Sequence, residues 1–188
     1  MKKLILILAL ITWLHPTLGL AALLTTKIDH EPEKVGDKFK LEVWLKGEGS
    51  DINALEGMLI WPDDKLKLLE IEEAPSIIGL WIKRPEVVDN NSLKFSGLLP
   101  GGFLEESGQL LSLNFEILKK GELEVRFDNT LALLNDGKGT PVSLTVDNLI
   151  LKVGSSNLGS KKQILFIILV IISLIILWFF RRRKKVSV

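Results

Sequence analysis

The stretch Leu98–Phe103, LLPGGF, combines a proline with two glycines, which are the residue types found in sorting signals and in phosphate-binding loops. It partly matches a cell-wall sorting signal, Leu-Pro-x-Thr-Gly, and its glycines invite comparison with a phosphate-binding loop. A sorting signal needs Thr at position 102 and a membrane segment directly after it, and this chain has neither there. A phosphate-binding loop opens a helix, whereas the residues after Phe103 lead into a strand pattern. Because Pro100, Gly101 and Gly102 favour a turn, we interpret the stretch as a projecting loop and, with Phe103, as a candidate contact site.

Catalytic side chains are scarce. The chain has two histidines, His15 and His30, and no cysteine. We expect His15 to be removed with a leader, and His30 alone supports neither a Ser-His-Asp triad nor a histidine-rich zinc site. Glycosidases need only two carboxylates at a set separation, but the acidic pairs here are sequence neighbours, which is typical of solvated charge: Asp63-Asp64, Glu72-Glu73 and Glu105-Glu106. We predict that the protein is not an enzyme.

The stretch Asn135–Gly139, NDGKG, is similar to part of a calcium-binding loop. An EF-hand loop supplies oxygen ligands at alternate positions and ends with a glutamate, but two leucines precede Asn135. We interpret the stretch as a tight turn, with a loose surface calcium site as the alternative. We predict no cofactor and no resident metal.

Three tryptophans lie between the two apolar ends of the chain, and an exposed indole can stack on a sugar ring or anchor a protein partner. Strand parity places Trp44 opposite the core residues Phe39 and Val43, so it faces solvent or lies under a loop. Trp81 lies in the irregular stretch IIGLWIKRP, whereas Trp61 ends a strand and is predicted to be core. Trp44 and Trp81 are therefore candidate ligand-binding residues.

The N-terminus has the pattern of a secretory signal peptide. Met1-Lys2-Lys3 is basic, and the following apolar run to Leu14 is too short to span a bilayer comfortably. Small residues at Gly19 and Ala21 suit a leader peptidase. We expect a signal peptide over residues 1–21, with cleavage after Ala21.

The C-terminus has the pattern of a membrane anchor. Residues 164–180 are apolar except for Ser173, and as a helix they would span about 25 Å, close to the roughly 30 Å hydrocarbon layer. Arg181–Lys185 are all basic, whereas only two lysines precede the apolar segment, so the positive-inside rule places the C-terminus in the cytoplasm. We expect a linker over 154–163, a transmembrane helix over 164–180, a basic tail over 181–188, and an extracellular domain over 22–153 on a single-pass protein of the cell membrane.

Charge is divided unevenly along the chain. Residues 22–160 hold 15 Lys and Arg against 23 Asp and Glu, a formal charge of −8, although the whole chain carries +1. An acidic domain argues against nucleic acid as a partner and against anionic lipid head groups. We predict that no nucleic acid is bound.

Segment 22–153 has the two-residue periodicity of half-buried strands. Phe39, Leu41 and Val43, for example, alternate with polar residues, and glycine, asparagine and aspartate punctuate the runs. The last run changes parity at Asp147-Asn148, where a bulge or bend would restore burial. We predict an all-β antiparallel β-sandwich with one short turn over 75–83 and about nine strands, near 23–29, 38–46, 52–61, 66–72, 92–97, 109–118, 121–127, 130–134 and 142–153.

Several ordered motifs in this segment resemble the cohesin domain family. KVGDKFKLEVWLKGEGSDINALEGMLIWPDDKLKLLEIE (34–72) has Val-Gly-Asp before a strand, then Ile-Asn-Ala-Leu-Glu-Gly leading into a strand that ends in an aromatic residue and proline. FSGLLPGGFLEESGQLLSLNFEILKKGELEVRF (95–127) and LLNDGKGT (133–140) continue in cohesin-like order. The resemblance implies a nine-stranded jelly roll, a fold shared with carbohydrate-binding modules, and a dockerin-like protein partner.

Three hypotheses about function are open at this point. The leading one is a membrane-anchored extracellular cohesin-like module that holds a protein partner at the cell surface. The alternatives are polysaccharide binding through an exposed tryptophan and a passive adhesion or envelope component.

Overall fold

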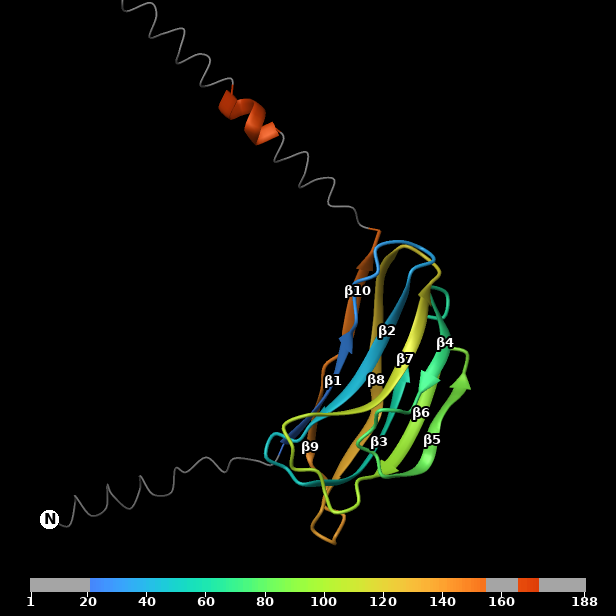
Figure 1. Ribbon diagram of the computed structural model, residues 1–188, viewed down its shortest axis with the longest axis vertical. Coiled ribbons are helices and arrows are strands. Elements are labelled where there is room, and N and C mark those ends of the chain that lie inside the picture. Colours follow the sequence, from blue (N-terminus) through green and yellow to red (C-terminus); the bar gives the residue numbers. More distant parts are fainter. Residues whose placement is uncertain (1–20, 155–165, 173–188) are drawn as a thin grey trace, which may run out of the picture. The chain divides into compact units, whose positions relative to one another are not determined.

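The computed structural model describes residues 21–154 and 166–172. The chain divides after Val153 into two compact units, which are considered separately. Within residues 21–154 the first unit has ten strands (Figure 1): β1 (Ala21–Ile28), β2 (Lys38–Lys46), β3 (Ile52–Ile60), β4 (Leu66–Glu72), β5 (Leu80–Asp89), β6 (Ser92–Leu98), β7 (Gly108–Ile117), β8 (Gly121–Leu134), β9 (Ser143–Val146) and β10 (Leu149–Val153).

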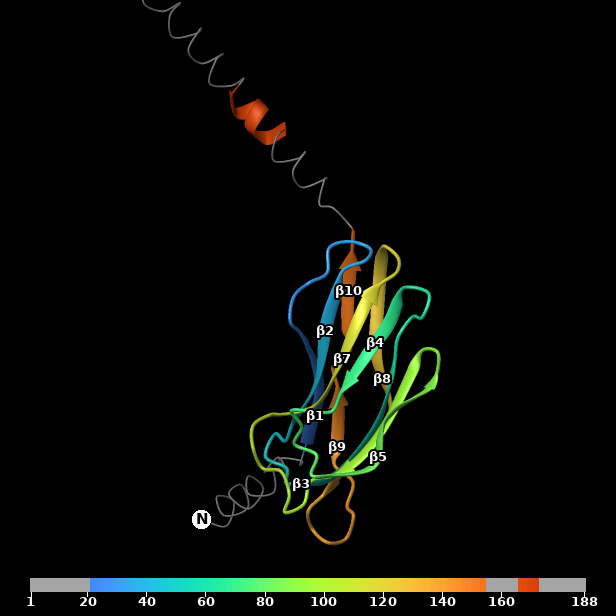
Figure 2. The same ribbon diagram turned by 45° about the vertical axis from the view of Figure 1, so that its right-hand side comes forward.

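The strands form two sheets of five that pack face to face (Figure 2). The first sheet has the order β4-β7-β2-β1-β9, and the second has the order β10-β8-β3-β6-β5. The predicted all-β sandwich is confirmed. One pairing departs from the antiparallel prediction, because β9 runs parallel to β1.

The core lies between the two sheets, where every second residue of the central strands is buried. In β2 the alternation runs through Phe39, Leu41, Val43 and Leu45, all at most 2% exposed. The ring of Trp61 meets that of Phe115 edge to face, with ring centroids 5.4 Å apart. The prediction that Trp61 is a core residue is therefore confirmed.

Strand β5 is not among the strands that the sequence predicts, and its first residues, 80–83, fall in the predicted short turn over 75–83. The strand lies at the edge of the second sheet, pairs with β6 alone among the described strands, and shifts register three times along its length. It contains Pro85, which is tolerated on an edge strand because one side needs no ladder hydrogen bonds. Large side chains such as Ile82 remain 64% exposed, so the strand lacks the alternation that identifies a half-buried strand.

Strand β8 is continuous, although the sequence predicts two strands with a break near Asp128-Asn129. Asn129 adopts a φ of 46°, and the pairing with β3 shifts register at this point. Polar residues that resemble a turn therefore form a bulge inside one strand.

The predicted last strand is two strands in different sheets. Asp147 donates its N–H to the Leu24 carbonyl in the first sheet (2.8 Å), and the Asn148 side chain accepts from the Phe127 N–H in the second (3.1 Å). The change of parity seen in the sequence thus marks a crossing between sheets rather than a bulge. Relative to the nine predicted strands, β5 adds one, the continuous β8 removes one, and this crossing adds one, which gives ten.

The predicted terminal segments are mostly outside the described residues. The leader over 1–21 is described only at Ala21, which begins β1. The predicted anchor over 164–180 is described at 166–172, which is helical and exposes its apolar side chains. Within residues 21–154 and 166–172, no helix has the length and hydropathy that a membrane crossing requires. The linker beyond Gly154 and the tail over 181–188 lie outside the described part.

Candidate functional site

The loop between β6 and β7 forms the predicted turn. Gly101 and Gly102 have φ of 88° and 84°, and the Gly102 N–H donates to the Leu99 carbonyl at 2.9 Å. Pro100 and Gly101 are exposed, whereas Phe103 is only 6% exposed and belongs to the core. The loop therefore exposes its proline and first glycine to solvent, and Phe103 packs into the sandwich.

A polar cluster that the sequence pattern does not predict lies against this loop at the end of β8. The Asn135 side chain donates to Asp51 at 2.9 Å and accepts from Asn53 at 3.1 Å. A side chain at position 102 would lie within 1.9 Å of the Asp51 carboxylate. Only glycine therefore fits at Gly102, for a reason that depends on residues distant in sequence.

The stretch Asn135–Gly139 is a tight turn, as predicted. Asp136 accepts hydrogen bonds from the Lys138 N–H and from the hydroxyl of Thr140. The Thr140 hydroxyl, followed by the Lys138 N–H, lowers the pKa of the Asp136 carboxyl. Across residues 21–154 and 166–172, no group of three or more His, Cys, Asp or Glu side chains could hold a metal ion.

The two candidate tryptophans do not form a pair, because they lie on different sheets. Trp44 is on the outer face of β2, where the Lys27 ammonium lies 3.6 Å from the ring centroid and Glu42 accepts from the indole N–H at 3.0 Å. One face of this ring is therefore covered by a lysine rather than by a loop. Trp81 on β5 points inward beside Gly97 and packs against the core.

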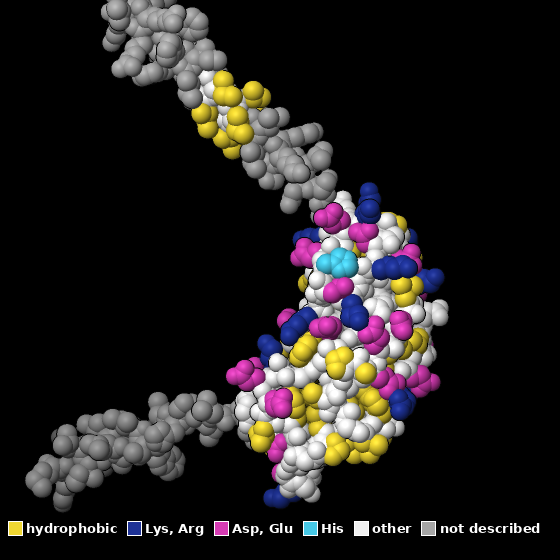
Figure 3. Space-filling view, in the orientation of Figure 1, with side chains coloured by type: hydrophobic (Ala, Val, Ile, Leu, Met, Phe, Trp, Pro, Cys, Tyr) yellow, Lys and Arg dark blue, Asp and Glu magenta, His cyan; other side chains and the backbone are white. Residues whose placement is uncertain are grey.

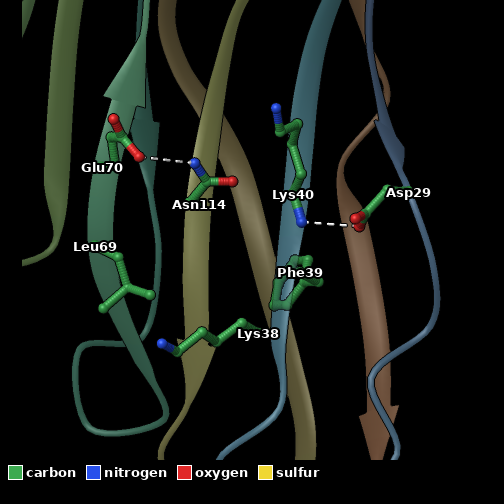
Figure 4. A pocket seen from close by; sticks show the side chains of 7 residues that line it. All are labelled: Asp29, Lys38, Phe39, Lys40, Leu69, Glu70 and Asn114. Atoms are coloured by element: carbon green, nitrogen blue, oxygen red, sulfur yellow. Dashed lines mark hydrogen bonds between the residues drawn. The ribbon is translucent and has the colours of Figure 1, made fainter.

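The outer face of the first sheet is charged, and its polar groups bond to one another. Glu72 accepts from the Lys40 ammonium at 2.8 Å and from the Asn114 amide at 2.7 Å. The shallow pocket of about 310 Å³ in Figure 4 lies on this sheet, and there Asn114 donates to Glu70 and the Lys40 N–H donates to Asp29. These polar groups of the face therefore already have partners within the domain.

We expect the hydrogen bonds among Lys40, Glu72 and Asn114 to make the stability of the folded domain sensitive to acid. The hydrogen bond from Lys40, followed by that from Asn114, lowers the pKa of Glu72 below its ordinary 4.5. The unfolded chain therefore takes up this proton first, so the stabilisation is present above the unfolded pKa and is lost as the pH falls through the folded pKa. Lowering the pH from about 7 to about 3 should reduce Tm, and Glu72→Gln should show a smaller reduction.

The measurement is thermal unfolding followed by circular dichroism at each pH. Glu116→Gln, on the outer face of β7 in the same sheet, is the matched control and should keep the wild-type pH dependence. An unchanged pH dependence in Glu72→Gln would contradict the assignment.

The outer face of the second sheet carries an apolar row across four strands. Leu80 on β5 is opposite Leu98 on β6, Leu98 is opposite Ala54 on β3, and Ala54 is opposite Leu133 on β8. Leu80 is 52% exposed, and the other three are half-buried. A groove of about 100 Å³ runs along this row, which we call the apolar row, and Leu131 also lines it.

Charged residues follow directly beside the apolar row. A second hollow of about 240 Å³ lies next along the same face, and Lys83, Lys94 and Asn129 line it together with Glu56. The bulge at Asn129 lies at this hollow. The face therefore combines apolar contacts at one end with ammonium groups beside them.

The apolar row lies near one end of the sandwich. It is next to Leu134, the last residue of β8, whereas Val153 pairs with Gly121, the first residue of β8. The row and the Leu98–Phe103 loop are therefore at the end opposite Val153 (Figure 1). Exposed hydrophobic side chains also gather toward the loop end in Figure 3, which shows the side of the molecule that faces the viewer in Figure 1.

No protein-family model matches the chain, and no curated protein matches it in sequence. Solved structures do resemble it. The seventh ScaB type I cohesin from Pseudobacteroides cellulosolvens superposes with a TM-score of 0.59 at 16% identity, covering 72% of this chain and 93% of that one. A non-cellulosomal cohesin from Archaeoglobus fulgidus gives 0.58 at 12% identity, covering 76% and 97%. A type I cohesin–dockerin complex from Clostridium thermocellum gives 0.58 at 14% identity, covering 72% and 93%.

These likenesses establish the fold class. Residues 21–153 form a cohesin-like β-sandwich of two sheets, as the resemblance in the sequence implied. The described domain has ten strands, one more than that resemblance implied.

Proposed function

We propose that the chain is a binding module that holds a dockerin-like protein at a cell surface, and that the apolar row is its contact surface. The apolar row carries the proposal, because apolar side chains that lie side by side on the outer face of a sheet are typical of an interaction site. The outer face of the other sheet is a weaker candidate, since Lys40, Glu72 and Asn114 there already bond to one another. Cohesin-like neighbours support a protein partner of dockerin type, because some of their structures are complexes with dockerins.

The side chains on the outer face of the second sheet indicate which groups the partner should present. A partner side chain that fills the groove beside Leu98 should be apolar, because burial of apolar surface contributes about 25 cal/mol per Å². Lys83 and Lys94 line the adjacent hollow, and the Lys83 ammonium already lies 3.7 Å from the Glu86 carboxylate. A carboxylate or a carbonyl oxygen on the partner would therefore pair mainly with Lys94. The partner therefore combines an apolar anchor with a neighbouring acceptor.

The proposal includes export and anchoring, which rest on the sequence. The leader at the N-terminus and the apolar segment 164–180 with its basic tail would leave the domain outside the membrane. Attachment after Val153 then leaves the apolar row at the end of the domain away from the attachment point.

The test is affinity capture from the host's own secreted proteins, with the full-length chain in membranes as bait. We expect mass spectrometry to identify a captured protein that contains a dockerin-like module, retained in the membrane fraction. A chain truncated before residue 164 should carry the same partner into the soluble fraction. Capture of polysaccharide alone, or of proteins without such a module, would contradict the proposal.

A further inference from the structure

Ala21 is built into the fold at the start of β1. Its backbone pairs with Ser143 of β9 and bridges to Gly49. Its carbonyl accepts a hydrogen bond of 2.6 Å from the hydroxyl of Ser50, which is fully buried. Ala21 is thus part of the folded sandwich.

Cleavage after Ala21, as the sequence suggested, would damage this arrangement. Ser50 would lose the acceptor of its hydroxyl, and a buried donor without a partner is costly. The new terminus would be Ala22, which has no exposed surface in the folded domain and is opposite Leu144. An α-amino group is mostly charged at neutral pH, and a charge beside the core is unfavourable.

We infer that the leader is removed two residues earlier, by hydrolysis of the Gly19–Leu20 peptide bond. Gly19 is the nearest small residue before Ala21, and Thr17 stands two residues before it, so a leader peptidase that requires small residues is still satisfied. In this step the bond between the Gly19 carbonyl carbon and the Leu20 nitrogen breaks. Water supplies hydroxyl to the carbon and a proton to the nitrogen, which leaves a carboxylate on Gly19 and an ammonium on Leu20. The inference rests on the export proposed above.

The test is N-terminal sequencing and intact mass of the full-length chain recovered from the membranes of its host. We expect the mature chain to begin at Leu20. A chain that begins at Ala22 would overturn this inference and leave export intact, whereas a chain that keeps Met1 would overturn the leader as well. In a second arm, Ala21→Leu should be processed like wild type, because it blocks only cleavage after residue 21. Loss of processing in that variant would overturn the Gly19–Leu20 site.

A stability comparison tests the structural reason separately. Full chains that begin at Leu20 and at Ala22 are compared by thermal unfolding, each with and without Ser50→Ala. We expect the chain that begins at Ala22 to have the lower Tm. Ser50→Ala should lower Tm only when Ala21 is present, because the Ala21 carbonyl is the acceptor of the Ser50 hydroxyl. Equal Tm values for the two starting points would overturn the inference.

Discussion

Replacing Leu98 with lysine is expected to weaken partner binding by roughly 100-fold while the sandwich remains folded. Leu98 occupies the middle of the apolar row, between Leu80 and Ala54. Truncating a central contact residue costs about 2–4 kcal/mol at interfaces. A lysine there would also bring an ammonium group into the contact, beside the ammonium groups of Lys83 and Lys94.

The matched control is Leu69→Lys, the same substitution on β4 of the opposite sheet. Leu69 is 40% exposed and lines the polar pocket of Figure 4, so it is outside the apolar row. We expect it to leave Kd unchanged when binding of the captured partner is measured by calorimetry. Equal effects of the two variants, with unchanged circular dichroism, would exclude the apolar row as the contact surface.

Replacing Gly102 with alanine is expected to destabilise the domain far more than replacing Gly101. Both residues have positive φ, 84° and 88°, so both alanines carry a backbone cost of about 1–2 kcal/mol. A Cβ at Gly101 meets nothing within 4 Å, whereas one at Gly102 would lie 1.9 Å from the Asp51 carboxylate oxygen and 2.6 Å from the Asn135 amide nitrogen. Overpacking should add a further ~1–3 kcal/mol for Gly102→Ala alone.

Urea unfolding of the two variants measures the difference, because the shared backbone cost cancels. A double-mutant cycle combines each glycine variant with Asp51→Ala, which removes the carboxylate oxygen that a new Cβ at position 102 would meet. We expect Asp51→Ala to recover part of the loss in Gly102→Ala and nothing in Gly101→Ala. If the two glycine variants have the same free energy of unfolding, position 102 does not pack against Asp51 and Asn135 as the structure shows.

The strands that could be predicted are those whose burial is local in the sequence. Phe39–Leu45 and the residues before Ile117 alternate because each strand is covered on one face only. Strand β5 has no such pattern, since its edge position leaves Leu80 and Ile82 exposed. The crossing at Asp147-Asn148 depends on which sheet each half joins, and that choice is made by partners distant in the chain.

The candidate site was harder to predict for the same reason. Turn chemistry alone was enough to identify the loop at Gly101 and Gly102, because positive φ is a local requirement. The apolar row depends on the register that sets Leu80 beside Leu98, and Ala54 beside Leu133. No spacing within a single segment contains that information. Strand parity correctly places Trp44 on an outer face, whereas Trp81 is a candidate by residue type alone. Their partners, Lys27 and the core, are set by neighbouring strands and could not be predicted from either signal.

The place of β10 has a mechanical consequence. A load applied to the apolar row and resisted by a tether after Val153 would pull the two ends of the domain apart along the strands. Strand β10 pairs with β8 through five residues, from Leu149 opposite Val125 to Val153 opposite Gly121. Antiparallel hydrogen bonds run perpendicular to the strands, so such a pull shears all of these rungs at once instead of opening them one after another. Under the proposed function, a cell that holds a partner against flowing liquid would apply its tension in the direction that this pair of strands resists best.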